Sequence, residues 1–364
     1  MLKSPLTLGF LALLFVFSIL NFLTPTKVFS DYENRRLAQF PTWSMERMIE
    51  GSFMIEFETY VNDQFVFRND WIRLKAVSER ILLKRENNGI FLGRDGYLFD
   101  KVLKPPSTLD RNVRYLEEFL ALYAHENITS MIVPNSFALL TQHRPRGVPF
   151  LDQVSFIERW EKDLGVFNVV PNLLAHQDEA IYHRSDHHWT LYGAYLAYEA
   201  LMHAWGLEAV PYETLDVQEV EGFLGSYYRR ARPVFYRGEV LRYYDPAIHS
   251  YQFFGETHDS LTNKELLSTR DPYRALMHGN IAFASVYRVE EAAVESRILI
   301  IKDSYAHALI PFLTHHFDQI DVVDLRHFNG SLKAVINAQS YDHILFLQNF
   351  MHFTQDPTLA RLRY

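Results

Sequence analysis

The chain has 364 residues, of which 48% are hydrophobic and 22% charged, and its formal net charge at pH 7 is -8. This composition is typical of a globular protein, and the acidic balance argues against a role in nucleic-acid binding. Because the sequence holds no cysteine, disulfides, thiolate metal sites and a cysteine nucleophile are excluded.

An apolar stretch, Leu6–Leu23, lies near the N-terminus. At 1.5 Å per residue, a helix of this length nearly crosses a hydrocarbon core of roughly 30 Å. The stretch runs into Asn21–Pro25 without the Ala-x-Ala pattern of a cleaved signal peptide. We therefore predict an uncleaved signal anchor over residues 1–24, which attaches the chain to a cell membrane by a single pass. A buried core helix is the alternative interpretation.

Two helices and a hairpin are predicted after the anchor. Apolar residues recur at helical spacing over Met45–Val61, with Ser44 as N-cap, and a second helix is expected over Asp70–Arg85. Asp95-Gly96 supplies the turn of a hairpin within Ile90–Phe99.

From residue 109 helices alternate with short apolar strands. Strands are predicted at Ser130–Val133, Val166–Val170, Arg297–Asp303, Ile320–Leu325 and His343–Leu347. Helices are expected between them, over Asp152–Asp163 and after Thr190 and Ser304, among others. This rhythm predicts an α/β fold with a mostly parallel sheet covered by helices on both faces.

Three regions follow from these patterns. Residues 1–24 form the anchor, and residues 25–108 form a juxtamembrane linker with the helical and hairpin region. Residues 109–364 form the α/β domain. Within that domain, residues 206–289 are polar, aromatic and rich in turns, and we interpret them as an insertion or cap over the edge of the sheet.

The residues with the clearest chemical character are Asp186–Thr190, an acid, two histidines, a tryptophan and a threonine. In an extended segment Asp186 and His188 point to the same face. A carboxylate beside a histidine fixes the imidazole tautomer and stabilises its charged form, as in a nucleophile triad. A helix cap, a packed core histidine or a metal ligand are the other interpretations. Because no clear third and fourth ligand follow, we predict no metal and no other cofactor.

A serine at the end of a strand, Ser304, is the candidate nucleophile. In open α/β sheets, reactive groups gather at the carboxyl ends of the strands. The amides at the start of the next helix would stabilise an oxyanion there. The alternative is that Ser304 is only a helix N-cap.

The stretch Tyr182–Thr190 with Gly193-Ala194 resembles the signature of the bacterial DHHW proteins, which are similar to the SGNH-hydrolase-like proteins of alginate O-acetylation. The resemblance covers most of the chain. Its other segments are Glu33–Arg35 with Leu37, Gly93–Leu98, Gly279-Asn280, Lys302–Tyr305 and Asp324–Arg326.

The resemblance implies an SGNH-like, flavodoxin-like sheet that carries a Ser-His-Asp triad. The nucleophile falls on Ser304, the base on His188 and the orienting acid on Asp186, while His187 and Trp189 are supporting residues. Acid and base precede the nucleophile along the chain, unlike in ordinary SGNH esterases, but geometry and not chain order defines a triad.

Two donors to the oxyanion are expected. Asn280 is the candidate side-chain donor, although it is equally well explained as a turn residue. The backbone amide of Ser304 or Tyr305 is the second. Aromatic residues between Phe223 and Phe254, with Arg229, Arg230 and Arg242, either hold sugar rings and anionic groups or form a small core of the insertion.

By this resemblance the protein moves an acyl group to or from a sugar hydroxyl of a cell-envelope polysaccharide, outside the cytoplasm. A membrane-bound O-acyltransferase partner would supply the acyl group. The alternatives are a carbohydrate O-acetylesterase, a metal-dependent hydrolase, and a non-catalytic assembly or binding subunit of a polysaccharide export and acetylation complex.

Overall fold

The computed structural model describes residues 4–30, 35–82 and 84–363. Two compact units divide the chain: residues 1–87 with 232–234 form one, and residues 88–231 with 235–364 form the other. Glu33 and Asn34 of the quoted motif lie outside the described residues.

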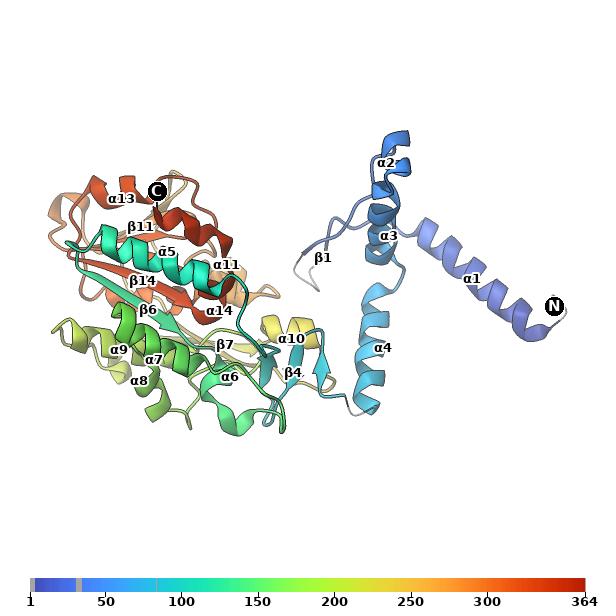
Figure 1. Ribbon diagram of the computed structural model, residues 1–364, viewed down its shortest axis with the longest axis horizontal. Helices are drawn as coiled ribbons and strands as arrows, with labels where there is room; N and C mark the ends of the chain where they lie inside the picture. Colours follow the sequence, from blue (N-terminus) through green and yellow to red (C-terminus); the bar gives the residue numbers. More distant parts are fainter. Residues whose placement is uncertain (1–3, 31–34, 83, 364) are drawn as a thin grey trace. The chain divides into compact units, whose positions relative to one another are not determined.

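The first unit begins with helix α1 (Pro5–Leu23), drawn in dark blue in Figure 1. Its mean hydropathy is 2.4 and none of its residues is buried. Among the described residues, α1 is the one helix long and apolar enough to cross a membrane, and a signal sequence meets the same criteria.

Three helices and three short strands complete this unit. They are α2 (Met45–Ile49), α3 (Ser52–Gln64), α4 (Arg68–Ile81), and the strands β1 (Phe29–Ser30), β2 (Arg35–Arg36) and β3 (Glu86–Asn87). Strands β1 and β2 pair as an antiparallel ribbon. The prediction of one helix over Met45–Val61 is wrong, because Gly51 adopts a left-handed conformation (φ +79°) that separates α2 from α3. Ser44 is the N-cap of α2 as predicted, since its Oγ accepts from the Arg47 amide at 3.2 Å.

The second unit is built on a sheet whose strand order is β10-β9-β11-β13-β12-β14-β6. Its strands are β6 (Ile128–Val133), β9 (Ser250–Phe253), β10 (Glu256–His258), β11 (Phe283–Tyr287), β12 (Arg297–Lys302), β13 (Gln319–Val323) and β14 (His343–Asn349). The pairs β13–β12, β12–β14 and β14–β6 are parallel, as the α/β pattern predicted. The edge formed by β10, β9 and β11 is antiparallel.

Helices cover both faces of this sheet. The longer ones are α5 (Leu109–Leu122), α7 (Gln153–Leu164), α8 (Val170–Ala175), α9 (Leu191–Ala204), α13 (Leu332–Ala338) and α14 (Phe350–Gln355). Figure 1 shows α5 and α13 on one face and α8 and α9 on the other. Further helical segments are α6 (Ser136–Leu139), α11 (Lys264–Leu267), α12 (Ile310–Leu313), η1 (Thr141–His143), η2 (Tyr212–Thr214), η3 (Pro272–Ala275), η4 (Glu291–Ala293), η5 (Ser304–Ala308) and η6 (Pro357–Arg363).

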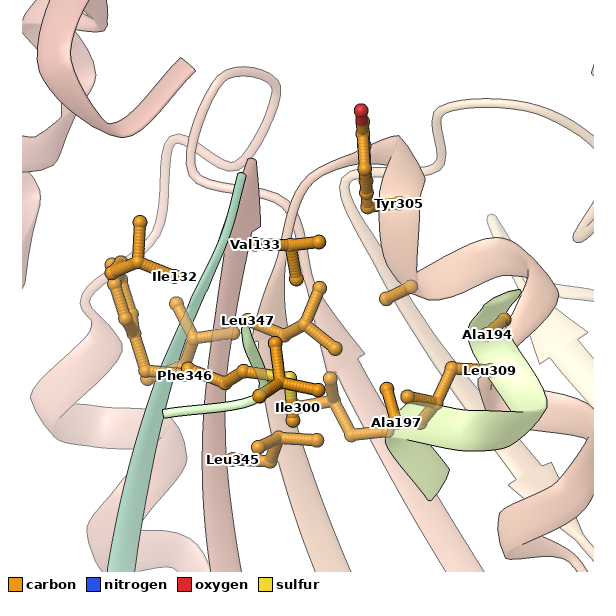
Figure 2. Close-up of a cluster of buried hydrophobic side chains, with 14 of the residues drawn as sticks. Ile132, Val133, Ala194, Ala197, Ile300, Tyr305, Leu309, Leu345, Phe346 and Leu347 are labelled. Carbon is orange, nitrogen blue, oxygen red and sulfur yellow. The ribbon is translucent and has the colours of Figure 1, made fainter. Parts of the chain in front are cut away.

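The core lies between the parallel strands and these helices. Figure 2 shows Ile300 and Leu345, from two neighbouring strands, on the side of Ala194 and Ala197 of α9, and Ile132 of β6 on the opposite side of the strands. All five side chains are fully or almost fully buried. Because parallel strands are buried on both faces, their sequences read as continuous apolar runs, which explains why they were easy to predict.

The predicted strand at Val166–Val170 is wrong. Phe167 forms only an isolated bridge with Met131, and α8 begins at Val170. Asn168 Oδ1 accepts from the Val170 amide at 3.0 Å and turns the chain. Pro171 then fits the first turn of a helix, where its missing N–H is not needed.

Part of residues 206–289, which were interpreted as an insertion or cap over the edge of the sheet, extends the sheet instead. They contribute β9, β10 and β11, together with a ribbon of β7 (Val217–Phe223) and β8 (Glu239–Tyr244) and the helix α10 (Ser226–Ala231). In β11 buried and half-buried residues alternate. Strands of this kind bury one face only and therefore look polar in the sequence.

The predicted hairpin is present. Strand β4 (Ile90–Leu92) pairs antiparallel with β5 (Leu98–Asp100). Asp95 and Gly96 both have positive φ, as a tight turn between two strands requires.

Candidate active site

The segment that carries the acid and the histidines joins a small hairpin to α9. Tyr182 and Trp189 form an antiparallel bridge, so residues between them make the tip of the hairpin. The Tyr182 hydroxyl donates to the Pro134 carbonyl at 2.6 Å, just beyond β6. Thr190 is the predicted N-cap of α9, since its Oγ1 accepts from the Gly193 amide at 3.1 Å. The tip is therefore fixed at the carboxyl end of the sheet.

Ser304 lies two residues beyond β12, at the same edge of the sheet. The cap of the following η5 turn is Asp303, whose Oδ1 accepts from the Tyr305 amide at 2.9 Å. Ser304 is therefore not the capping residue, and its hydroxyl is free for another partner.

The structure brings Ser304, His188 and Asp186 into one hydrogen-bonded chain. His188 Nε2 lies 2.8 Å from Ser304 Oγ, and His188 Nδ1 lies 2.5 Å from Asp186 Oδ1. All three residues are at least nine-tenths buried. The two loops that meet here are 116 residues apart in sequence.

The charge of Asp186 determines which atoms donate in these two hydrogen bonds. Burial raises the pKa of Asp186, but the bond from His188 and the amide of Ser226 outweigh it and hold that pKa well below its usual range. An ionised carboxylate only accepts hydrogen bonds, so His188 Nδ1 must carry the hydrogen. Nε2 then accepts from the Ser304 hydroxyl, which is the arrangement of a base that can remove the serine proton.

The two expected supporting residues lie beside this chain. His187 packs on His188 with ring centroids 3.8 Å apart, and its Nδ1 is 2.7 Å from Ser226 Oγ. Burial lowers the pKa of His187 to about 3, so this ring is neutral at physiological pH. Trp189 is fully buried and donates from Nε1 to the Tyr305 carbonyl at 2.9 Å, which ties the hairpin to the η5 turn.

The loop that holds Asp186 was not predicted from the sequence. The Ser226 amide, at the start of α10, donates to Asp186 Oδ2 at 2.6 Å. A Cβ atom added to Gly225 would lie 2.2 Å from the Cβ of Asp186, so only glycine allows this approach. Nothing in the spacing of residues 223–226 indicates such a contact, because it depends on tertiary structure.

A tyrosine from η3 was also missed. The ring of Tyr273 stacks on His188 with centroids 3.8 Å apart and an interplanar angle of 10°. Its hydroxyl donates to the Ser304 carbonyl at 3.3 Å. Tyr273 therefore contacts both the imidazole and the serine backbone.

The two predicted oxyanion donors lie in different surroundings. Asn280 is exposed, and its Oδ1 accepts from Arg326 Nη2 at 3.5 Å. The Tyr305 amide is already bonded to Asp303 Oδ1. The Ser304 amide, in contrast, has no hydrogen-bond partner among the described residues. Which groups receive an oxyanion stays a prediction, and the Ser304 amide is the donor that is available.

A buried charged cluster lies under the η5 turn. Lys302 Nζ is 2.7 Å from His307 Nε2 and 3.3 Å from Asp324 Oδ2, and Asp324 also pairs with Arg326 at 2.6 Å. Burial lowers the pKa of Lys302 to about 8. Burial and the neighbouring Lys302 hold the pKa of His307 well below its usual range, so this ring is neutral and accepts from the ammonium.

Asp186, His187 and His188 also offer three potential ligand atoms within 4.8 Å of one another. These atoms already make hydrogen bonds. The Asp186 carboxylate bonds His188 and Ser226, and His187 Nδ1 bonds the Ser226 hydroxyl. A metal ion would have to replace this network, so the donor set fits a proton-transfer site better than a metal site.

The arginines proposed to hold anionic groups are paired with carboxylates. Arg229 bonds Asp271 at 3.0 Å, Arg230 bonds Asp100 at 2.6 Å, and Arg242 bonds Glu219 at 2.7 Å. Several aromatics of the same region form a small core, as the second interpretation had it; that core contains Phe223, Leu241, Tyr243, Tyr273 and Leu276.

A cavity of about 340 Å³ borders the hairpin that carries the acid. It is lined by Tyr97, Tyr182, His183, Arg184, Thr190, Tyr192, Glu239 and neighbouring residues, and not by Ser304, His188 or Asp186. Glu239 accepts from the Arg184 amide at 2.9 Å and the Ser185 amide at 2.8 Å, so its role is to hold the hairpin.

The fold and the site together define an α/β protein with a buried serine–histidine–carboxylate chain at the carboxyl edge of its sheet. The family model described as DHHW protein matches residues 154–323. The resemblance to this family that the motif indicated is thereby confirmed. None of the curated proteins matches this chain.

Two solved structures share the fold, and a third is similar at a lower score. A DHHW family protein from Eubacterium siraeum has a TM-score of 0.61 and 22% identity, over 76% of this chain and 95% of that one. Bacillus cereus PatB1, solved with a sulfonyl adduct, has a TM-score of 0.60 and 17% identity, over 74% of this chain and 98% of that one. The O-acetyltransferase domain of Pseudomonas putida AlgJ has a TM-score of 0.45 and 16% identity, over 76% of this chain and 98% of that one.

Proposed function

We propose that the protein is an O-acyltransferase-type enzyme that moves an acyl group to or from a sugar hydroxyl of a cell-envelope polysaccharide. The observation that carries the proposal is the continuous chain from Ser304 Oγ through the His188 ring to Asp186. The motif that resembles the DHHW proteins, and through them the alginate O-acetylation proteins, supports the choice of acyl transfer to sugars.

In the proposed reaction His188 Nε2 takes the Ser304 proton while Ser304 Oγ attacks the acyl carbonyl. Asp186 holds the imidazole and stabilises its positive charge. The Ser304 amide is the nearest available donor to the oxyanion, and such a donor typically contributes roughly 100- to 1000-fold in turnover. The protonated His188 then gives its proton to the leaving group, and an acyl-Ser304 ester remains.

A hydroxyl group resolves this ester in the second half of the reaction. Its oxygen attacks the acyl carbon, its proton passes to His188, and Ser304 Oγ leaves and recovers a proton from His188. A sugar hydroxyl as acceptor gives a transferase, and water gives an esterase.

The proposed setting is the outer side of a cell membrane. α1 has the length and composition of an anchor. An anchored domain remains beside a membrane-bound O-acyltransferase partner, which supplies the acyl group in this proposal.

Covalent labelling tests the proposal directly. The full chain in detergent is treated with 4-nitrophenyl acetate and, separately, with a sulfonyl fluoride, and modified peptides are identified by mass spectrometry. PatB1, which shares the fold, was solved with a sulfonyl adduct, which makes this class of probe appropriate. We expect one label per chain, on Ser304, and at least a 1000-fold loss of nitrophenol release in Ser304→Ala.

Ser331→Ala is the matched control, because Ser331 is exposed and only caps α13. This variant should label like the wild type, and a chelator should not change either result. Labelling of Ser304→Ala at the wild-type rate, or full sugar acetylation in cells that carry only this variant, would contradict the proposal and favour a non-catalytic subunit.

A further inference from the structure

A second acid–histidine pair lies beside Ser304, and the proposed reaction does not use it. His352, in α14, lies with its Nδ1 2.8 Å from Asp303 Oδ2. Asp303 is the residue directly before the serine and is fully buried. Because Asp303 follows β12 and His352 follows β14, the pair bridges two neighbouring parallel strands at their carboxyl ends.

The charge of Asp303 fixes the tautomer of His352. Burial raises the pKa of Asp303, but the His352 bond and the Asn349 amide outweigh it, so the carboxyl is ionised. Its oxygens therefore only accept, and His352 Nδ1 is the donor. Nε2 has no partner within the described residues and is free to form a hydrogen bond with an incoming hydroxyl.

The position of this ring places it at the candidate site. His187 lies between the two pairs: its ring centroid is 3.8 Å from that of His188 and 6.3 Å from that of His352. The side chain of His352 is 36% exposed, whereas that of His188 is 5% exposed. His188 thus faces the serine from within, and His352 presents a free ring nitrogen at the rim of the same site.

We propose that His352 Nε2 binds a hydroxyl of the acceptor sugar while a neighbouring hydroxyl attacks the acyl-Ser304 ester. This inference rests on the proposed function. The ligand is a polyhydroxylated acceptor, since one hydroxyl must react and a second must reach the rim. An imidazole fixed by a buried carboxylate is preorganised for such a contact, which lowers the entropic cost of binding.

The covalent step does not involve His352. The new bond joins the acceptor oxygen to the acyl carbon, and the bond between that carbon and Ser304 Oγ breaks. The acceptor proton passes to His188 and then to Ser304. His352 orients the sugar through a second oxygen, so it decides how often a sugar, rather than water or a simple alcohol, takes the acyl group.

Two substitutions separate this role from a structural one. In His352→Asn the amide nitrogen lies where Nδ1 was and still donates to Asp303, but nothing replaces Nε2. In His352→Gln the side-chain amide lies where Nε2 was and can still form a hydrogen bond with a hydroxyl. His143→Asn is the matched control, because His143 makes the same kind of pair with Asp95, at 2.8 Å, and neither residue is part of the site.

The full chain in detergent is given 4-nitrophenyl acetate with either methyl glucoside or methanol as acceptor. Methyl glucoside has neighbouring hydroxyls and methanol has one. Acetylated acceptor and free acetate are measured by mass spectrometry and NMR. Both products come from one acyl-enzyme, so their ratio does not change when a variant is merely less stable.

We expect the wild type and His143→Asn to prefer methyl glucoside over methanol. In His352→Asn this preference should fall about 10-fold, the equivalent of one hydrogen bond, and His352→Gln should recover part of it. The inference about His352 is wrong, and the proposed function stands, if His352→Asn keeps the wild-type preference. The same holds if the wild type labels at Ser304 but does not prefer methyl glucoside. A wild type that does not label at Ser304 shows instead that the proposed function has failed.

Discussion

At the scale of single residues, the candidate base is held from three directions. Asp186 bonds one nitrogen of His188, Ser304 bonds the other, and Tyr273 stacks on the face of the ring. The electron-rich face of a tyrosine attracts a cation, so in the proposed reaction Tyr273 would stabilise an imidazolium at His188. We expect Tyr273 to act as a positioning residue.

The first prediction separates the ring of Tyr273 from its hydroxyl. Tyr273→Phe keeps the stacked ring, so we expect ester hydrolysis within about threefold of the wild type. Tyr273→Leu removes the ring, and we expect a loss of about 10-fold or more in kcat. The dependence of kcat/KM on pH should change in Tyr273→Leu and match that of the wild type in Tyr273→Phe.

Equal losses in the two variants would show that the hydroxyl, through its bond to the Ser304 carbonyl, is what matters. A loss of activity without a change in the pH profile would indicate that Tyr273 acts only by filling its small core.

At the scale of elements, the carboxyl ends of the strands are tied together by one buried carboxylate. Asp303 follows β12 and accepts from the Tyr305 amide at 2.9 Å, the Asn349 amide at 2.8 Å and His352 Nδ1 at 2.8 Å. These bonds join the η5 turn to the end of β14. The position of Ser304 therefore depends on Asp303 even though Asp303 does not contact the serine hydroxyl.

The second prediction concerns stability and pH. Asp303→Asn should lower the free energy of unfolding by about 2–4 kcal/mol at pH 7, because a buried, charged acceptor of three bonds is lost. Since the pKa of Asp303 is lowered in the folded chain, its contribution is complete above the pKa of the unfolded chain, near 4, and is lost as the pH falls further. The gap between wild type and variant should therefore be constant from pH 5 to 8 and narrow below pH 4.

Urea unfolding followed by tryptophan fluorescence measures this gap. Asp110→Asn, an exposed acid in the first turn of α5, is the control and should change stability by less than about 0.5 kcal/mol at any of these pH values. A gap that persists undiminished at pH 3 would show that the charge of Asp303 is not what stabilises the turn.

At the scale of the whole molecule, the chain combines an apolar helix with the α/β unit that carries Ser304, His188 and Asp186. Within the first unit, α1 packs against the turn between α3 and α4. Asn21 Oδ1 accepts from the Val66 amide at 2.9 Å, and Phe17 stacks on Phe65 with centroids 6.1 Å apart. These contacts give α1 partners in the folded chain, and a retained anchor, as proposed, would keep them.

The third prediction tests the anchor. The chain made in cells should keep residues Pro5–Leu23, as read from its intact mass, and should stay with the membrane in alkaline carbonate. A double substitution, Leu13→Lys with Val16→Lys, adds about 2.5–3.5 kcal/mol for each charge at the centre of a membrane helix and should release the chain. Leu207→Lys, at a partly exposed site of the second unit, should have no such effect. An intact mass that lacks the apolar stretch would show that it is a signal sequence.

Much of the fold was predictable, for local reasons. The parallel strands β6, β12, β13 and β14 were found because strands buried on both faces form continuous apolar runs. Caps at Ser44 and Thr190 were found because a hydroxyl before a helix bonds its free amides. The antiparallel strands of residues 206–289 were missed, because strands with only one buried face resemble loops in a sequence this rich in tyrosine and arginine.

By itself, the sequence determined the kinds of groups available and their local geometry. Asp186 and His188 share a face because they are two residues apart, and Ser304 follows a strand because the four aliphatic residues Ile298–Ile301 stand just before it. Only the tertiary structure decided that these groups meet, and that Gly225, Tyr273 and the Asp303–His352 pair surround them. The reason is physical: contacts between segments tens to more than a hundred residues apart depend on how the strands are ordered in the sheet, and residue spacing along the chain does not encode that order.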